Sequence, residues 1–182
     1  MKYSAMAALA LIALFASDAL ASCPTPARGL YSYAGITWYD YTPDSSCVSP
    51  SGNVSSTTLA CGDSGYEFGS GYYNDVTYSF TPEDGKVLTE WQVDMSIDFD
   101  DPNNNWFNQI SAYVTVTHNG SPTTTYIITH DGTQGSLSSC NWPSATFAAA
   151  AGDTVEVTVN GQKFYTNTTI KSSFPRIFTV SP

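Results

Sequence analysis

Apolar and polar residues alternate with a period of two along most of this chain. The pattern is clearest between Val87 and Phe99, where every second side chain from Trp91 onward is apolar. Successive side chains of a β-strand point to opposite faces, so this pattern predicts a long strand with one face in a core. No segment after residue 21 shows a convincing helical period. The chain is therefore expected to be almost entirely β-structure.

Two Asn-Gly dipeptides stand between strand-like segments. Asn-Gly is the strongest short hairpin signal, because both positions of a tight type I′ turn need a positive φ. The first predicted hairpin comprises strands 107–118 and 123–130 around Asn119-Gly120, and the second comprises strands 153–159 and 162–165 around Asn160-Gly161. Shorter strands are predicted at 30–33, 36–41, 76–80 and 176–180.

The predicted strands favour an all-β fold, an antiparallel β-sandwich of jelly-roll or Greek-key type stapled by disulfides. A closed barrel is the alternative. Residues 41–72 are predicted to form one long irregular loop. Loops of that length are either functional or disordered, and the cysteines within this one favour order.

The first 21 residues have the features of a secretion signal. Lys2 is followed by the apolar run Met6–Phe15 and by the small-residue cleavage site Ala19-Leu20-Ala21. Residues 22–182 are then expected to form a single secreted, extracellular domain. An alternative is a lipid anchor at the cell surface through Cys23, because Leu20-Ala21-Ser22-Cys23 resembles a bacterial lipobox. No later apolar run is long enough for a transmembrane segment.

Four cysteines remain after the signal is removed, and an even number in an exported protein predicts two disulfides. Cys47 and Cys61 bracket a Ser/Gly/Thr-rich segment, which favours a bond between them. Cys23 with Cys140 follows by elimination, although four cysteines allow three connectivities.

The mature chain is strongly acidic. The full sequence has 6 basic and 16 acidic residues, and removing Lys2 and Asp18 with the signal leaves the net charge unchanged. Such a domain repels phosphate backbones and anionic lipid surfaces, so nucleic acid is excluded as a partner.

An acidic and amide-rich segment is the candidate metal site. Calcium takes several oxygen ligands around a tight turn, and carboxylates and amides at close spacing supply them. The candidate ligands are Asp98, Asp100, Asp101, Asn103 and Asn105. The match to an EF-hand fails after Asn105, because Trp106 replaces the usual glycine and no glutamate closes the loop. The alternative is ordinary turn chemistry, in which Asp and Asn bond to their own backbone.

Aromatic residues in predicted loops are the candidate ligand-binding surface. Aromatic faces stack on the apolar faces of sugar rings while polar side chains bond the hydroxyl groups. The candidate residues are Trp106, Trp142, Tyr66, Tyr72 and Tyr73. Any one of these rings could instead anchor its own loop onto the sandwich.

The sequence therefore predicts a secreted, non-enzymatic binding domain for an extracellular glycan, assisted by calcium. Two alternatives stay open: a surface protein that self-associates, and a small hydrolase that uses carboxylates. No spacing singles out a catalytic pair of carboxylates. The oligomeric state is likewise open.

Overall fold

The computed structural model describes residues 29–33, 36–41, 47–82, 89–137, 140–165 and 167–181. The predicted signal peptide and Cys23 lie outside these ranges, so secretion and the alternative lipid anchor stay predictions. Within the described ranges, no helix is both long and apolar enough to cross a bilayer.

The described chain is almost wholly antiparallel β-structure, as the alternation predicts. The strands in chain order are β1 (Gly29–Tyr33), β2 (Ile36–Tyr41), β3 (Val48–Ser51), β4 (Val54–Thr58), β5 (Ser64–Phe68), β6 (Gly71–Phe80), β7 (Thr89–Asp94), β8 (Ile97–Asp100), β9 (Gln109–His118), β10 (Ser121–Asp131), β11 (Ser144–Ala149), β12 (Thr154–Lys163), β13 (Thr169–Ser173) and β14 (Arg176–Ser181). One short 3-10 helix, η2 (Gly132–Gln134), follows β10.

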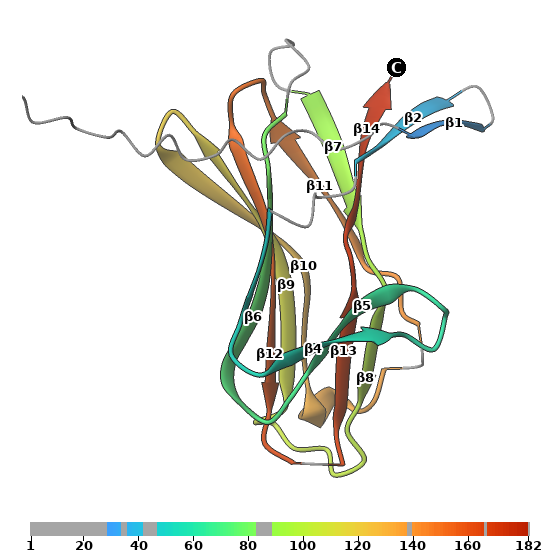
Figure 1. The fold of residues 1–182 in the computed structure, drawn as a ribbon, viewed down its shortest axis with the longest axis vertical. Helices are drawn as coiled ribbons and strands as arrows, with labels where there is room; N and C mark the ends of the chain where they lie inside the picture. The colour runs from blue at the N-terminus through green and yellow to red at the C-terminus, as the bar shows by residue number, and fades with distance from the viewer. Residues whose placement is uncertain are drawn as a thin grey trace, which may run out of the picture.

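Three sheets form two facing layers (Figure 1). One layer is the sheet β10-β9-β12-β6-β3, and the other combines β1-β2-β14-β7-β11 with β4-β5-β13-β8. The last two sheets are continuous, because β7 passes into β8 and β13 passes into β14 after two residues each. Ser96 and Ser173 join these bends: the Ser96 N–H donates to the Ser173 hydroxyl over 2.9 Å, and the Ser173 N–H donates to the Ser96 carbonyl over 2.8 Å. The chain is therefore an antiparallel β-sandwich with one bent layer.

The core lies between the two layers and contains the apolar positions that the alternation predicts. Trp91, Val93, Met95, Ile97 and Phe99 are all buried. The same holds for alternate residues of the facing strands: Ile110, Ala112 and Val114 of β9, and Val155, Val157 and Val159 of β12. Burial of this shared apolar surface holds the layers together.

The first predicted hairpin is confirmed and the second is wrong. Asn119 and Gly120 have φ values of 50° and 80° and connect β9 to β10. Asn160 and Gly161 instead lie inside β12, which continues to Lys163 and pairs with strands on both sides. Gly161 is needed there for packing, because an added Cβ would lie 2.3 Å from Cγ of Phe68.

The long irregular loop predicted for residues 41–72 is also wrong, because this segment contains β3, β4 and β5. Strands β3 and β4 lie at sheet edges and are mostly exposed. Such strands carry Ser and Thr on both faces, so no apolar alternation reveals them. Strands β11 and β13 were likewise not predicted.

The predicted cysteine pairs are wrong in this structure. Cys61 and Cys140 are free thiols, whereas Cys47 is disulfide-bonded. The topology separates Cys47 from Cys61, because Cys47 precedes β3 in one layer and Cys61 follows β4 in the other. The Ser/Gly/Thr-rich segment between Cys47 and Cys61 predicts a closed loop, but in the structure it crosses from one layer to the other.

Gly161→Ala tests the reassignment of this glycine from a turn to the core. We expect the free energy of unfolding to fall by about 1–3 kcal/mol, because the added methyl group overpacks against Phe68. Chemical denaturation measures the change, and Glu156→Ala on the outer face of β12 is the control. Equal stability of Gly161→Ala and the wild type would contradict the packing described here.

Candidate functional site

Five aromatic rings from three separate segments are in contact at one end of the sandwich. Tyr72 and Tyr73 begin β6, Trp106 and Phe107 lie between β8 and β9, and Phe164 follows β12. The ring centroids are 3.6 Å apart for Trp106 and Phe107, 5.0 Å for Phe107 and Phe164, 4.3 Å for Phe164 and Tyr72, and 6.2 Å for Tyr72 and Tyr73. We call this group the aromatic end-cluster.

The aromatic end-cluster is unusually open to solvent. Trp106 is 57% exposed, Tyr72 54% and Tyr73 76%, while Phe164 is half-buried beneath its neighbours. A ring that only anchors its loop gains most when it is buried. Contiguous exposed aromatic surface is instead typical of an interaction site.

A β-bulge places the two tyrosines. Gly161 pairs with Asn74 and Lys163 pairs with Gly71, so Tyr72 and Tyr73 together face a single residue of β12. Tyr73 has φ 60°, in the left-handed region that side chains other than glycine seldom adopt. Bulges re-aim side chains and are frequent beside functional sites.

The side chain of Asn74 holds this bulge in place. Its amide donates to the carbonyl oxygens of Gly69 and Gly71 over 3.1 Å each, and its oxygen accepts from the Asn53 N–H over 2.7 Å. The Asn74 side chain is buried, and its three bonds are partly shielded from water. Such bonds offset part of the cost of the unusual backbone at Tyr73.

A buried carboxylate organises the loop that carries the two other exposed rings. Asp101 is fully buried, and its Oδ1 accepts from the Asn103 N–H over 3.1 Å and from the Thr168 hydroxyl over 3.3 Å. Its Oδ2 accepts from the Asn105 N–H over 2.8 Å and from the Asn108 side-chain amide over 3.0 Å. Four donors thus surround one carboxylate, as a buried charge requires.

Asn108 extends this arrangement to the neighbouring strand. Its oxygen accepts from the Phe164 N–H over 2.8 Å, and its amide also donates to the Thr168 hydroxyl over 3.0 Å. Next to it, the Gln109 side chain donates to the Trp106 carbonyl over 3.0 Å. The backbone beneath Trp106 and Phe164 is therefore held by hydrogen bonds from several segments.

The three candidate calcium-binding carboxylates take different partners. Asp98 accepts from backbone N–H groups on two separate loops, Asp100 accepts from the Ser136 hydroxyl over 2.9 Å, and Asp101 faces inward. The described residues contain one group of three possible metal ligands whose donor atoms lie within 4.8 Å of one another. This group includes Asp98 but neither Asp100 nor Asp101.

The two candidate amide ligands are also engaged. The Asn103 amide donates to the Asn167 oxygen over 2.9 Å, and the Asn105 oxygen accepts from the Phe107 N–H over 2.9 Å. The structure therefore shows hydrogen bonds from Asp and Asn side chains to nearby backbone groups, as expected if this segment is an ordinary turn. Calcium binding by this loop stays a prediction.

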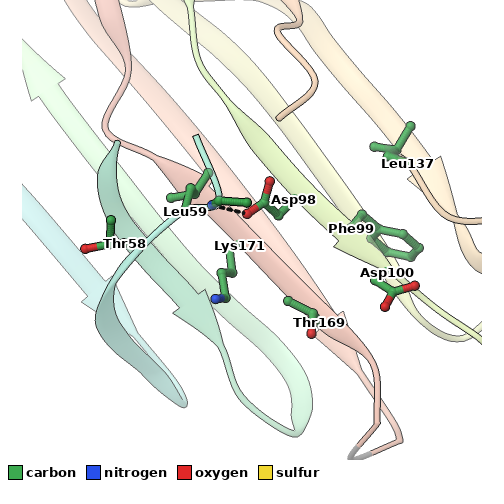
Figure 2. Close-up of a pocket in the computed structure, with 9 residues that line it drawn as sticks. Thr58, Leu59, Asp98, Phe99, Asp100, Leu137, Thr169 and Lys171 are labelled. Carbon is green, nitrogen blue, oxygen red and sulfur yellow. Dashed lines mark hydrogen bonds between the residues drawn. The ribbon is translucent and has the colours of Figure 1, made fainter. Parts of the chain in front are cut away.

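A polar hollow lies nearby, on the outer face of β8 and β13. Its volume is about 570 Å³. Thr169 and Lys171 of β13 lie beside Asp98 and Asp100 of β8 (Figure 2). Phe99 lines it but is buried, so the hollow offers hydrogen bonds and charge without an open ring face.

The structure unites three of the five predicted ligand-binding aromatics: Trp106, Tyr72 and Tyr73. Tyr66 is half-buried and packs edge-on against Phe174 at 5.7 Å. Trp142 is 55% exposed, but it follows Asn141, which is bridged to Ile97 at the start of β8, whereas Trp106 lies beyond the end of β8.

Two members of the aromatic end-cluster, Phe107 and Phe164, were not predicted. The sequence pattern predicts that Phe107 begins a strand and that Phe164 lies in the returning strand of the second hairpin. Their only signal in the sequence is aromatic character beside a strand end.

Comparisons with known proteins identify a fold but no family. No protein-family model matches the chain, and no curated protein matches its sequence. The crystal structure of the CBM22-1–GH10 modules of Clostridium thermocellum endo-1,4-beta-D-xylanase 10B, complexed with xylohexaose, is similar over 75% of this chain, with TM-score 0.50 and 10% identity. This similarity covers 26% of that chain, so the protein spans about a quarter of its length.

Two further solved structures are similar at lower scores. The xylan-binding module CBM15 gives a TM-score of 0.44 at 11% identity, over 86% of this chain and 97% of that one. A family 6 carbohydrate-binding module gives 0.42 at 12% identity, over 88% and 98%. At such identities, structural likeness concerns the fold, and the first comparison supports the β-sandwich.

Asp101→Asn tests whether the buried carboxylate organises the loop. We expect the free energy of unfolding to fall by about 2–3 kcal/mol, because the amide that replaces one oxygen cannot accept from the donors facing it. The exposed carboxylate of Asp100 provides the control, and Asp100→Asn should cost less than about 1 kcal/mol. Urea denaturation measures both variants, and equal costs would contradict this role.

Proposed function

We propose that this protein binds a polysaccharide chain, without breaking it down, through the aromatic end-cluster. The observation that carries the proposal is the run of contacting rings, three of which are more than half exposed at the end of a sandwich. Exposed rings offer the apolar faces on which a sugar ring stacks, because its axial C–H groups form an apolar surface of matching size.

Polar groups stand beside these rings, as a sugar-binding site requires. Asn103 and Asn167 are exposed and joined by a side-chain hydrogen bond next to the loop that carries Trp106. Gln109 and Gln162 are half-exposed at the neighbouring ends of β9 and β12. Such amides both donate to and accept from hydroxyl groups, and a few placed polar groups orient a ligand over apolar surface.

The rigidity of the site supports binding rather than incidental exposure. The bulge at Tyr73 is held by Asn74, and the Trp106 loop is held by Asp101 and Asn108. A preorganised surface does not spend binding free energy on ordering its own loops.

Trp106→Ala tests the proposal. The structure of the xylanase modules contains xylohexaose, so this oligosaccharide and soluble xylan are the first probes, followed by a panel of other glycans. We expect isothermal titration calorimetry to show an affinity loss of roughly tenfold, or about 1.4 kcal/mol, on removal of the ring.

Trp142→Ala is the matched control, because Trp142 is as exposed as Trp106 but adjoins the start of β8, whereas Trp106 of the aromatic end-cluster lies beyond its end. Its affinity should equal that of the wild type. A loss in Trp142→Ala with no loss in Trp106→Ala or Tyr73→Ala would move the site elsewhere. Absence of binding to every glycan would overturn the proposal.

Calcium assistance of this binding is tested by titration. Calcium takes six to eight oxygen ligands, whereas both Asp101 oxygens already accept two hydrogen bonds each. The exposed Asp100 carboxylate would therefore be the principal ligand, and saturating calcium should raise the thermal midpoint and the glycan affinity relative to a chelator. Asp100→Asn should abolish this rise, and an unchanged midpoint in the wild type would contradict calcium binding by the loop.

A further inference from the structure

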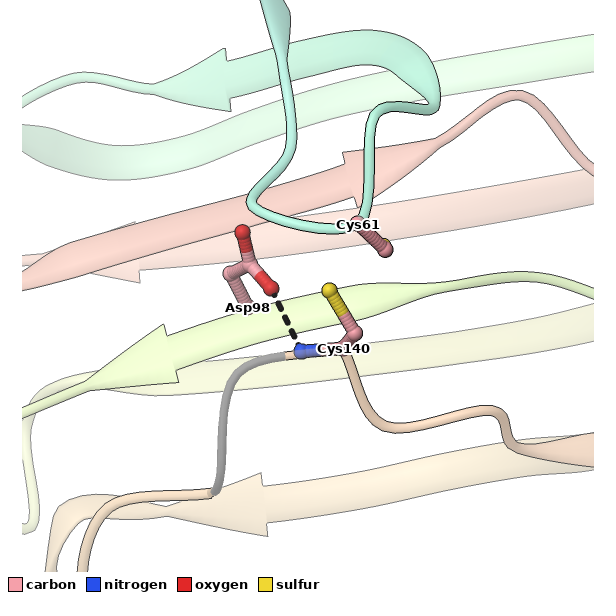
Figure 3. A group of neighbouring side chains, drawn as sticks. All are labelled: Cys61, Asp98 and Cys140. Atoms are coloured by element: carbon pink, nitrogen blue, oxygen red, sulfur yellow. Dashed lines mark hydrogen bonds between the residues drawn. The ribbon is translucent and has the colours of Figure 1, made fainter.

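Two cysteines far apart in sequence meet on the outer face of β8. Cys61 lies in the loop between β4 and β5, and Cys140 lies shortly before β11. Their sulfur atoms and a carboxylate oxygen of Asp98 all lie within 4.8 Å of one another (Figure 3). Both cysteines are free thiols in this structure.

The Asp98 carboxylate brings the two loops together. One oxygen accepts from the Ala60 N–H over 2.9 Å, and the other accepts from the Cys140 N–H over 2.8 Å. Asp98 is buried, so these bonds satisfy a charge that is screened from water. One side chain thus fixes the backbone at one cysteine and next to the other.

Each loop is also held independently. The Leu59 N–H donates to the Asp63 carbonyl over 2.8 Å, and the Ser96 hydroxyl donates to the Asp63 carboxylate over 2.7 Å. On the other side, Asn141 exchanges backbone bonds of 2.9 and 3.1 Å with Ile97. The two sulfur atoms therefore lie within 4.8 Å of each other, between segments that hydrogen bonds already hold in place.

We propose that Cys61 and Cys140 form a disulfide in the mature protein, which joins the β4–β5 loop to the segment before β11 across β8. Formation removes a proton and an electron from each thiol. A disulfide of the glutathione class, or that of a thiol oxidoreductase, accepts the electrons and is reduced to two thiols. Cys47 is already disulfide-bonded and does not compete for either sulfur.

The electrostatics of the site suit a structural disulfide. Partial burial, together with hydrogen bonding to Cys61 and the nearby Asp98 charge, raises the pKa of the Cys140 thiol to about 12. Reactive cysteines and metal-binding thiolates occur instead where the thiol pKa is lowered. Because the thiolate is disfavoured here, ionisation does not stabilise the reduced pair against the disulfide.

A metal ion is the rival occupant of this position. Structural zinc sites use four protein ligands, whereas the described residues bring three groups together here. Both oxygens of Asp98 are also engaged by backbone N–H groups. The chemistry therefore favours the disulfide, and metal content is one outcome of the test.

The disulfide would stabilise the loop that forms one wall of the polar hollow. Thr58, Leu59 and Ala60 line the hollow immediately before Cys61, and Asp98 belongs to both sites. This inference does not depend on glycan binding, since the aromatic end-cluster shares no residue with the cysteine pair.

Peptide mapping of the full-length protein tests the proposal. The protein is refolded in a glutathione redox buffer, alkylated in denaturant without reduction, digested and analysed by mass spectrometry. We expect a cross-linked peptide that contains Cys61 and Cys140 and has lost two hydrogens, with neither cysteine alkylated. Alkylation of both, or a cross-link from either to another cysteine, would overturn the proposal.

Variants separate the disulfide from the metal. The double variant Cys61→Ser, Cys140→Ser should unfold several degrees below the oxidised wild type. Under reducing conditions, which break the Cys47 disulfide in both proteins, the double variant and the wild type should unfold at similar temperatures. Asp98→Asn should lower the yield of the cross-linked peptide and raise that of glutathione adducts. One bound zinc per chain, lost in Cys140→Ser, would favour the metal instead.

Discussion

Alternate side chains of β6, β9 and β12 must be buried against the layer that contains β7, β8, β13 and β14, and this constraint shapes the molecule. It gives each strand one inward face, so side chains that are free to contact a ligand lie mainly at the strand ends. Where β6 begins and β12 ends, the apolar sequence continues past the core, so aromatic rings emerge into solvent as one contiguous surface. The aromatic end-cluster is thus an extension of the core pattern to the rim of the sandwich.

Buried carboxylates connect that core to its loops. Asp101 satisfies four donors at the end of the sandwich, and Asp98 joins two loops over the outer face of β8. In both places a charge excluded from water is acceptable only because backbone and side-chain donors surround it. The same requirement makes these loops rigid, which favours a preformed binding surface at one and a disulfide at the other.

The sequence predicts those elements whose side chains alternate between core and solvent, such as β9 and the segment from Trp91 to Phe99. It does not predict β3 and β4, which lie at sheet edges and bury little apolar surface, or the straight course of β12 through Asn160 and Gly161. Of the aromatic residues predicted from the sequence, Trp106, Tyr72 and Tyr73 lie in the aromatic end-cluster, although Tyr72 and Tyr73 belong to β6 rather than to a loop. Phe164 was missed, because its contact with Tyr72 depends on the register of β12 against β6 and on a bulge that no local pattern encodes.

Side-chain NMR of the tryptophans during a xylohexaose titration tests the central claim most directly. The chain has four tryptophans, and each indole N–H gives its own signal. Glycan binding at the aromatic end-cluster predicts that the Trp106 signal moves and saturates with the ligand while the Trp142 signal stays in place, with backbone shifts concentrated at Tyr72, Tyr73 and Phe164. Shifts centred on Trp142, or on Thr169 and Lys171 beside the polar hollow, would contradict the account.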